Sequence, residues 1–355
     1  MYYFLLFFLV MLLVVLGGGS NICKNVVSLK RIHLVVFFSL LFLMGTRHYS
    51  VGTDTITYVG EFLGTSTNGN LRQILTSATE PLYNLTLWIC KKFTSNYTWF
   101  LIVFSFPVAW GFTFLIKKYS DDYLLSVLLF IVLGIFGFCM AGIRQAAALG
   151  ITMLSYYFIK EKKLVKFLLC VFVAYGFHNS ALVYLLAYVF VNILSIKKIT
   201  SYWIMTVICL CLGVVRNPIV LKLAQIMMME DRFDGYTQGG NSGLNYTMFI
   251  IQAILLLFSC LYMKKKQTLK NEGNLKLLAL SFVGLCFQAF TPIVGEFFRV
   301  SMYFSVYQCI LVPNVIREIE NRRTKTIVYF GILAVSFMYI FLVQGTVTSY
   351  IPFWK

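Results

Sequence analysis

The chain has 355 residues, of which 59% are hydrophobic and only 12% are charged, and its mean hydropathy is +0.81. Soluble domains carry about 25% charged residues, so this composition excludes a soluble globule and favours a protein dissolved in a lipid bilayer. The formal charge of +17 would also suit a nucleic-acid-binding protein, but that function needs a concentrated basic face. Here the basic residues lie in small clusters between apolar segments, and no nucleic-acid partner is expected.

Apolar segments, several of them short, follow one another along the chain. A spanning helix needs about 20 mostly apolar residues, and the candidate segments are 2–16, 32–46, 99–116, 123–141, 145–159, 164–178, 180–194, 199–215, 246–263, 275–291, 297–312 and 326–343. We therefore predict an all-α polytopic membrane protein with about 12 transmembrane helices, in which residues 1–355 form a single integral membrane domain. The first segment lacks a basic region before it, so a cleaved signal peptide is not expected.

The basic residues indicate how these segments are oriented, because Lys and Arg accumulate on the cytoplasmic side of membrane proteins. Two thirds of them fall on one side when the segments alternate, in clusters at 24–31, 117–118, 160–166, 197–198, 264–276 and 317–325. We predict that this side is cytoplasmic and that both ends of the chain lie outside.

The first long outer loop, 47–98, contains a segment that interrupts the alternation. Within 71–92, apolar residues recur at three- and four-residue steps with polar residues between them, which is typical of an amphipathic helix. If this segment crossed the membrane, every later basic cluster would move outside. We therefore expect a helix that lies at the outer interface.

The start of the same loop carries the first candidate site residues. Arg47 and His48 end the second apolar segment, and Asp54 follows Gly52 and Thr53 among several hydroxyl side chains. Asp54 is a candidate general base or acceptor for sugar hydroxyls. The alternative is that Thr53 or Asp54 caps a helix.

Two further candidates lie between later apolar segments. Arg144 and Gln145 join two segments almost without a loop, and an arginine this close to hydrocarbon normally faces a polar cavity or an anionic partner. Snorkelling to the interface is the alternative. His178 occupies the next outer connection, where it is either a structural group or part of the same site.

The second long outer loop, 216–245, combines three methionines with charged residues, among them Arg232, and a glycine-rich stretch. Loops of this length are often lids or binding loops, and a solvated connector is the alternative. Farther on, Glu296 and Arg299 have the spacing of a helical ion pair, and Arg299 and Tyr303 would share one helix face.

Two classes of site find no support in the sequence. The nine cysteines lie mostly in apolar segments without C-x-x-C spacing, so we expect them to pack as small hydrophobic residues. No DxD-like motif is present, and we expect neither a metal ion nor a cofactor to be bound. The arginines instead suit an anion, because the guanidinium fork matches phosphate oxygens.

The order of these motifs resembles the EpsG family of bacterial exopolysaccharide and O-antigen polymerases of the Wzy type. The resemblance rests on Arg47, Gly52-Thr53-Asp54 and Tyr58, on Gly142-Ile143-Arg144-Gln145-Ala146, on Phe177-His178-Asn179-Ser180, and on Arg299 with Tyr303. It implies a GT-C-like helical enzyme of the bacterial inner membrane. Its activity would be the polymerisation of undecaprenyl-pyrophosphate-linked oligosaccharide repeat units on the outer, periplasmic face, with chain length set by a separate regulator.

Under this interpretation the site residues take two kinds of role. Asp54 is the first choice for the catalytic base, followed by His178 and Glu296. The residues expected to bind pyrophosphate or glycan are Arg47, His48, Tyr58, Arg144, Gln145, Arg232, Arg299 and Tyr303. An O-antigen ligase would differ only in its acceptor, whereas a flippase for lipid-linked oligosaccharides would place ionisable residues along a path through the membrane.

Overall fold

The computed structural model describes residues 26–68, 80–194, 198–214, 243–265, 272–291, 295, 297–339 and 351–354. The apolar segment 2–16, most of the predicted loop 216–245 with Arg232, and Glu296 lie outside the described residues. The described part is built of helices, and its one isolated β-bridge joins Arg47 to Pro352.

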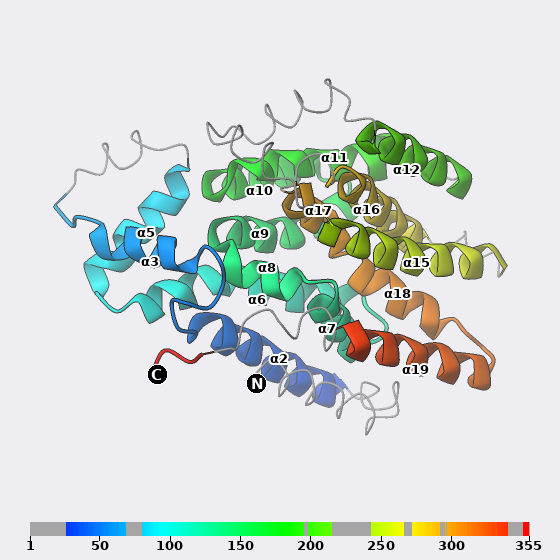
Figure 1. The fold of residues 1–355 in the computed structure, drawn as a ribbon, viewed down its shortest axis with the longest axis horizontal. Helices are drawn as coiled ribbons and strands as arrows, with labels where there is room; N and C mark the ends of the chain where they lie inside the picture. Colours follow the sequence, from blue (N-terminus) through cyan, green and yellow to red (C-terminus); the bar gives the residue numbers. More distant parts are fainter. Residues whose placement is uncertain are drawn as a thin grey trace.

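Every apolar segment predicted within the described residues coincides with helical structure. The larger helices are α2 (Val26–Gly45), α6 (Tyr97–Tyr119), α9 (Ile143–Lys160), α10 (Leu164–Phe177), α12 (Ile199–Val214), α15 (Gly243–Lys265), α16 (Glu272–Ala289) and α19 (Arg322–Tyr339). They lie side by side, and most of them run roughly parallel to the long axis of the molecule (Figure 1). The chain is therefore an all-helical bundle.

Three predicted segments are not single regular helices. Residues 123–141 form α7 (Tyr123–Val132) and α8 (Ile135–Ala141), which are bent by 58° at Gly134, a glycine with a φ of +74°. Residues 297–312 are divided between α17 (Phe297–Ser305) and α18 (Gln308–Arg317). The segment 180–194 consists of the 3-10 helix η2 (Asn179–Tyr184), the short α11 (Leu185–Tyr188) and the π-helix η3 (Val189–Leu194).

The first outer loop contains two helices. Of the predicted helical segment 71–92, residues 71–79 lie outside the described residues. Residues 81–92 are helical, as the periodicity predicts, and form most of α5 (Pro81–Phe93), which begins at a proline and buries Tyr83, Leu87 and Cys90. The second helix, α3 (Thr55–Gly64), was not predicted. Both helices lie together at the left-hand end of the molecule (Figure 1). The structure contains no lipid, so the interfacial position of α5 stays a prediction.

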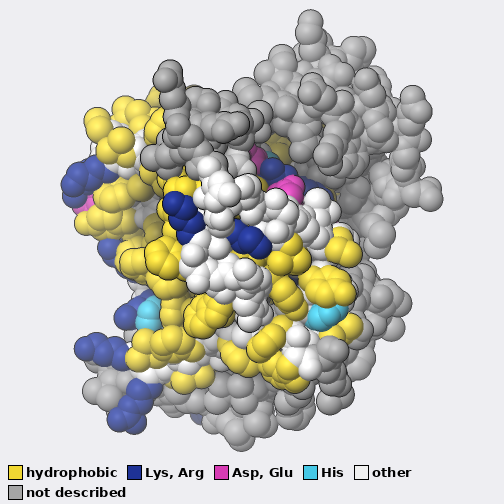
Figure 2. All heavy atoms as spheres, turned by 90° about the vertical axis from the view of Figure 1, so that its left-hand side faces the viewer, with side chains coloured by type: hydrophobic (Ala, Val, Ile, Leu, Met, Phe, Trp, Pro, Cys, Tyr) yellow, Lys and Arg dark blue, Asp and Glu magenta, His cyan; other side chains and the backbone are white. Residues whose placement is uncertain are grey.

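Apolar side chains cover much of the outside of the bundle, as Figure 2 shows for one end. They include residues of the long helices that are more than half exposed, such as Phe38 on α2, Phe172 on α10, Ile208 on α12 and Leu261 on α15. In water such a surface would be costly, whereas lipid accommodates it. The helical architecture and this surface identify a membrane protein.

Judged by length and composition alone, only some of the described helices could cross a membrane. Among the described residues, α6 is long and apolar enough to cross a membrane, and α7 with α8 passes as one bent span. The stretches Leu164–Phe177, Asn179–Leu194, Ile199–Leu212 and Thr247–Met263 are apolar but shorter. The predicted count of about 12 spans and the GT-C-like arrangement therefore stay predictions.

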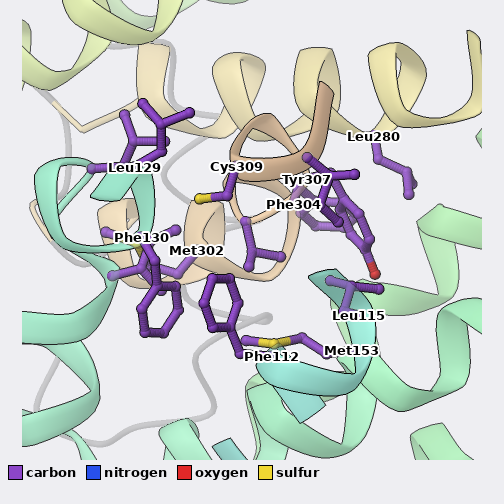
Figure 3. Packing of buried hydrophobic residues seen from close by; sticks show 14 of the residues in the cluster. Phe112, Leu115, Leu129, Phe130, Met153, Leu280, Met302, Phe304, Tyr307 and Cys309 are labelled. Carbon is purple, nitrogen blue, oxygen red and sulfur yellow. The ribbon is translucent and has the colours of Figure 1, made fainter. Parts of the chain in front are cut away.

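The centre of the bundle is close-packed. Phe112 of α6 stacks on Phe130 of α7 with ring centroids 3.9 Å apart, next to Met302, Phe304 and Tyr307 (Figure 3). Helices α6 and α9 approach each other most closely at two glycines, Gly111 and Gly150, where an added Cβ would collide with the backbone of the other helix. This packing fixes the start of α9, which carries Arg144.

Candidate functional site

Ionisable side chains from five helices, or from residues that flank them, converge at the end of the bundle that carries α3 and α5. They come from the residue before α3, from α3 itself, from the start of α5, from the start of α9, from the residue after α10 and from α17. Figure 2 views this end and shows acidic and basic side chains beside one another in a recess. None of these helices supplies more than a few polar groups, so the site exists only in the folded bundle.

Asp54 and Arg299 form the first ion pair. The Nη2 atom of Arg299 donates to Oδ2 of Asp54 at 3.2 Å, and both side chains are about one third exposed. Asp54 occupies the N-cap position of α3, but its side chain makes no capping hydrogen bond. The carboxylate is directed to Arg299 instead, which is not what a capping role requires.

The turn before Asp54 depends on Gly52. Its φ is +94°, and an added Cβ would lie 2.5 Å from the carbonyl oxygen of Met140. The Thr55 hydroxyl and the Nη2 of Arg47 both donate to the same carbonyl oxygen, at 2.9 Å. The end of α8 therefore holds the turn that carries Asp54.

Arg144 and Glu80 form the second ion pair, with Nη1 of Arg144 2.7 Å from Oε2 of Glu80. The Glu80 side chain is only 7% exposed, whereas that of Arg144 is 28% exposed. The guanidinium lies 5.1 Å from the ring centroid of Tyr58 and 5.2 Å from that of Tyr83. Aromatic faces attract a cation at this distance, so Arg144 is held on three sides and still reaches the surface.

Tyr83 connects this pair to a third carboxylate. Its hydroxyl donates to Oε2 of Glu61 at 2.5 Å. Burial raises the pKa of Tyr83, and the hydrogen bond and negative charge of Glu61 raise it further. Tyr83 therefore remains a neutral hydrogen-bond donor between α5 and α3.

His178 lies next to Glu80, between α10 and η2. Its Nδ1 accepts from the backbone N–H of Ser180 at 3.2 Å, so the proton of the neutral ring is on Nε2. Nε2 lies 3.9 Å from Oε1 of Glu80, which is too long for a hydrogen bond. Burial, together with the positive charges of Arg144 and Arg299, lowers the pKa of His178 to about 3. The ring is neutral at physiological pH and presents an N–H group to Glu80.

Buried polar contacts link the two ion pairs from below. Gln145 donates from Nε2 to the carbonyl oxygen of Arg299 at 3.1 Å. The Ser180 hydroxyl lies 2.8 Å from Nδ1 of His178 and 3.1 Å from the hydroxyl of the buried Tyr303. Helices α9, α17 and η2 are therefore held together directly beneath the charged groups.

The structure brings together most of the residues that the sequence singled out, namely Asp54, Tyr58, Arg144, Gln145, His178, Arg299 and Tyr303. Arg47 is fully buried and donates to the carbonyl oxygens of Met44 and Met140, so it holds the backbone and is not open to a ligand. His48 contacts Ser50 through its Nδ1 at 2.8 Å and pairs its backbone N–H with Ile351. Glu296 and Arg232 lie outside the described residues.

Sequence reasoning did not single out Glu61, Glu80, Tyr83 or Ser180. The signal for Glu80 was present in the sequence, because it is a carboxylate directly before Pro81, which marks the start of an amphipathic helix. Nothing in the sequence shows that α5 brings this carboxylate to Arg144, 64 residues later. Glu61 belongs to the helix that was not predicted.

The described residues contain no group of three or more His, Cys, Asp or Glu side chains that could hold a metal ion. None of the cysteines among these residues forms a disulfide. Five of them are buried, namely Cys90, Cys139, Cys260, Cys286 and Cys309. The groups that the site does offer are carboxylates next to arginines. This set can accept a proton and stabilise an anion at neighbouring points.

Comparison with known proteins places the chain in a family. No curated protein and no solved structure matches the chain. A family model does match, over residues 30–354, which include every site residue described above. By this match over essentially its whole length, the chain belongs to the EpsG family.

Proposed function

We propose that this protein polymerises oligosaccharide repeat units linked to a polyprenyl (undecaprenyl) pyrophosphate, by glycosyl transfer on the outer face of the bacterial inner membrane. Membership in the EpsG family supports a polymerase-type function in exopolysaccharide or O-antigen synthesis. The observation that carries the proposal is the convergence of two arginine–carboxylate pairs, Asp54–Arg299 and Glu80–Arg144, at one end of the bundle. In a glycosyl transfer from a diphosphate, a carboxylate can take the proton of the acceptor hydroxyl and an arginine can stabilise the charge on the leaving diphosphate.

The arginines would bind the diphosphate of the donor. Arg144 and Arg299 are each partly exposed, and each uses one terminal nitrogen in its ion pair. A guanidinium presents its N–H donors in a planar fork, a geometry that suits phosphate oxygens. In this proposal the two arginines, and not a metal ion, stabilise the charge on the leaving group.

Asp54 would act as the base. A hydroxyl of the acceptor sugar attacks the anomeric carbon of the donor, and its proton passes to the Asp54 carboxylate. The bond between that carbon and the diphosphate oxygen breaks, and its electron pair stays on the diphosphate. The side chain of Asp54 is 30% exposed, compared with 7% for Glu80, so Asp54 is the carboxylate that an acceptor reaches more readily.

Glu80 and His178 would position the other groups. The buried Glu80 holds Arg144 in place, and the Nε2–H group of His178 faces the second oxygen of the same carboxylate. In the neutral ring Nδ1 is the nitrogen that can accept a proton, and it already accepts from the Ser180 N–H group. The geometry therefore favours Asp54 over His178 for proton transfer.

The test is polymerisation of lipid-linked repeat units by purified protein. Asp54→Asn retains the shape of the side chain and an oxygen for Arg299, but it removes the basic carboxylate. We expect the rate to fall by about 10²–10⁴-fold, the usual contribution of a general base. Asp121→Asn is the matched control, because Asp121 is an exposed aspartate before α7, outside the proposed site, and this variant should retain the wild-type rate.

Near-normal turnover by a folded Asp54→Asn protein would remove Asp54 from the chemistry. The reaction class is tested separately by deleting the gene and examining the surface glycan. Loss of a polymerase leaves single repeat units on the surface acceptor, loss of a ligase leaves polymer on the lipid carrier, and loss of a flippase leaves neither at the surface. Either of the last two results would overturn the proposed function.

A further inference from the structure

An apolar cavity lies beside the charged site. Its volume is about 290 Å³, close to the lower end of the range for ligand pockets, about 300–1,000 Å³. Helix α6 supplies much of the wall, including Val103, Phe106 and Pro107, and Thr86 of α5, Ala147 of α9 and Phe177 of α10 complete it. Three of these four helices, α5, α9 and α10, also present Glu80, Arg144 and His178.

A short series of contacts joins the cavity to Arg144. Phe104, in the cavity wall, packs edge-to-face on Tyr83 with ring centroids 5.4 Å apart, and Arg144 lies over the ring of Tyr83. Ala147 is one helical turn beyond Arg144 on α9, and Phe177 directly precedes His178. A molecule in the cavity would therefore have one end within a few side chains of the arginine.

The wall of the cavity offers nothing for a sugar to bind. Thr86 contributes the only hydroxyl among the lining side chains, and this hydroxyl donates to the carbonyl oxygen of Leu82 at 2.7 Å. Sugar hydroxyls that are buried without hydrogen-bond partners are costly. The chemistry of the wall selects a hydrocarbon.

The cavity also meets the lipid-facing surface of the bundle. Val103 and Phe106 are both 41% exposed, so they belong both to the cavity wall and to the outer surface of α6. A hydrocarbon chain can pass from the bilayer into the cavity without crossing polar groups. Its charged head would then lie at the two arginines.

We propose that this cavity binds the first isoprene units of the prenyl chain of the substrate, those next to the diphosphate. The inference rests on the proposed function, because that function supplies a ligand with an anionic head and a long apolar tail. The cavity and Arg144 together match this pattern at one place. The cavity would thus fix the position of the diphosphate relative to Asp54.

A kinetic experiment tests the proposal with two substrates, a repeat unit on a long prenyl diphosphate and the same unit on a short-chain analogue, an ethyl diphosphate that lacks any isoprene unit. Both are assayed with the protein in the same detergent micelles. Val103→Trp fills the cavity from its exposed side, and Val207→Trp, on α12, adds the same bulk at a position 56% exposed outside the cavity. We expect Val103→Trp to raise KM for the long-chain substrate about tenfold, as the loss of about two buried methylene groups would.

The expected result for the short-chain analogue is an unchanged KM in both variants, because too little of the chain remains to fill the cavity. The proposal is overturned if Val103→Trp affects both substrates equally, or if it behaves like Val207→Trp.

A binding measurement keeps the cavity separate from the reaction. A benzophenone-bearing polyprenyl diphosphate should label a peptide from α5 or α6 in the wild type and in Val207→Trp, and less in Val103→Trp. If the wild type converts neither substrate but is labelled in this way, the proposed function fails and the cavity stands. Absence of label from these peptides contradicts the cavity proposal whatever the catalytic result.

Discussion

Asp54 occupies the N-cap position of α3, where an aspartate normally accepts a hydrogen bond from the helix backbone. Its carboxylate binds Arg299 instead, a residue 245 positions later in the chain. From the sequence, capping and catalysis were both open for this residue. The choice between them depends on where α17 packs, which no local pattern reveals.

A lysine at position 144 should not support the polymerisation rate that Arg144 supports. Lysine retains the positive charge but loses the planar fork, which here donates to Glu80 while the guanidinium lies over Tyr58 and Tyr83. We expect Arg144→Lys to reduce the polymerisation rate at least roughly tenfold, the equivalent of about 1.4 kcal/mol of transition-state stabilisation.

The control is Arg322→Lys, at an exposed arginine at the start of α19, which should polymerise at the wild-type rate. A wild-type rate for Arg144→Lys, measured at an equal amount of folded protein, would show that the fork is not needed.

His178 should make the stability of the protein depend on pH. Its pKa is about 3 in the folded protein and near 6.5 in the unfolded chain, so between these values the unfolded chain binds a proton that the folded protein does not. Stability therefore falls as the pH is lowered from about 6.5 towards 3. The groups that face the ring are Glu80, Arg144 and Arg299, and the two arginines oppose its protonation.

The measurement is thermal unfolding at pH 7 and at pH 5. Asn in place of His178 retains an oxygen for the Ser180 N–H group but does not titrate in this range. The wild type should lose more of its melting temperature on acidification than His178→Asn does. Equal losses in the two proteins would show that His178 does not contribute to the acid sensitivity.

At the scale of elements, the long helices were predictable because each is encoded by a continuous apolar segment. The irregular elements were not. Nothing in the apolar stretch 123–141 distinguishes a straight helix from one bent at Gly134, and α3 is short and partly polar. The sequence nevertheless places candidate site residues in the loop that contains α3, because Asp54 follows the end of a long apolar segment.

Gly52 should be the least replaceable glycine near the site. Ala at a φ of +94° is strained, and its Cβ would meet the carbonyl oxygen of Met140. We expect Gly52→Ala to destabilise the protein by at least about 1–2 kcal/mol, the cost of a left-handed conformation for a residue with a Cβ, and to lower its melting temperature. The same change should slow polymerisation, since the turn carries Asp54.

Gly60→Ala in α3 is the matched control. No atom lies within 4 Å of the Cβ that it would add, and alanine is favoured over glycine inside a helix by about 0.5–1 kcal/mol. Its melting temperature should stay the same or rise. If both variants melt alike, the conformation of Gly52 does not limit stability.

At the scale of the whole molecule, the bundle carries different chemistry at its two ends. The site end presents paired charges, whereas the basic clusters gather around other helix ends, for example at Lys160, the last residue of α9, and at Arg317, the last residue of α18. Because Lys and Arg mark the cytoplasmic side, the site should face outward. The sequence alone predicts this orientation, because the prediction depends only on where the basic clusters lie between the apolar segments.

Cysteine labelling in intact cells tests the orientation. In a background without native cysteines, Ser50→Cys should react with a membrane-impermeant maleimide, because Ser50 is exposed and close to Asp54. Glu320→Cys, equally exposed but between α18 and α19, should react only after the membrane is permeabilised. Labelling of Glu320→Cys in intact cells would reverse the orientation and place the site inside.

The pairing of each arginine with a carboxylate has a consequence for the end of the catalytic cycle. In the empty site these four groups sum to no net charge, and each carboxylate competes with a diphosphate for its guanidinium. Because each carboxylate is tethered beside its arginine, its effective concentration there is high. Two unpaired arginines would retain the spent carrier more tightly. The built-in competitor thus favours product release, which an enzyme that adds one unit after another must achieve at every cycle.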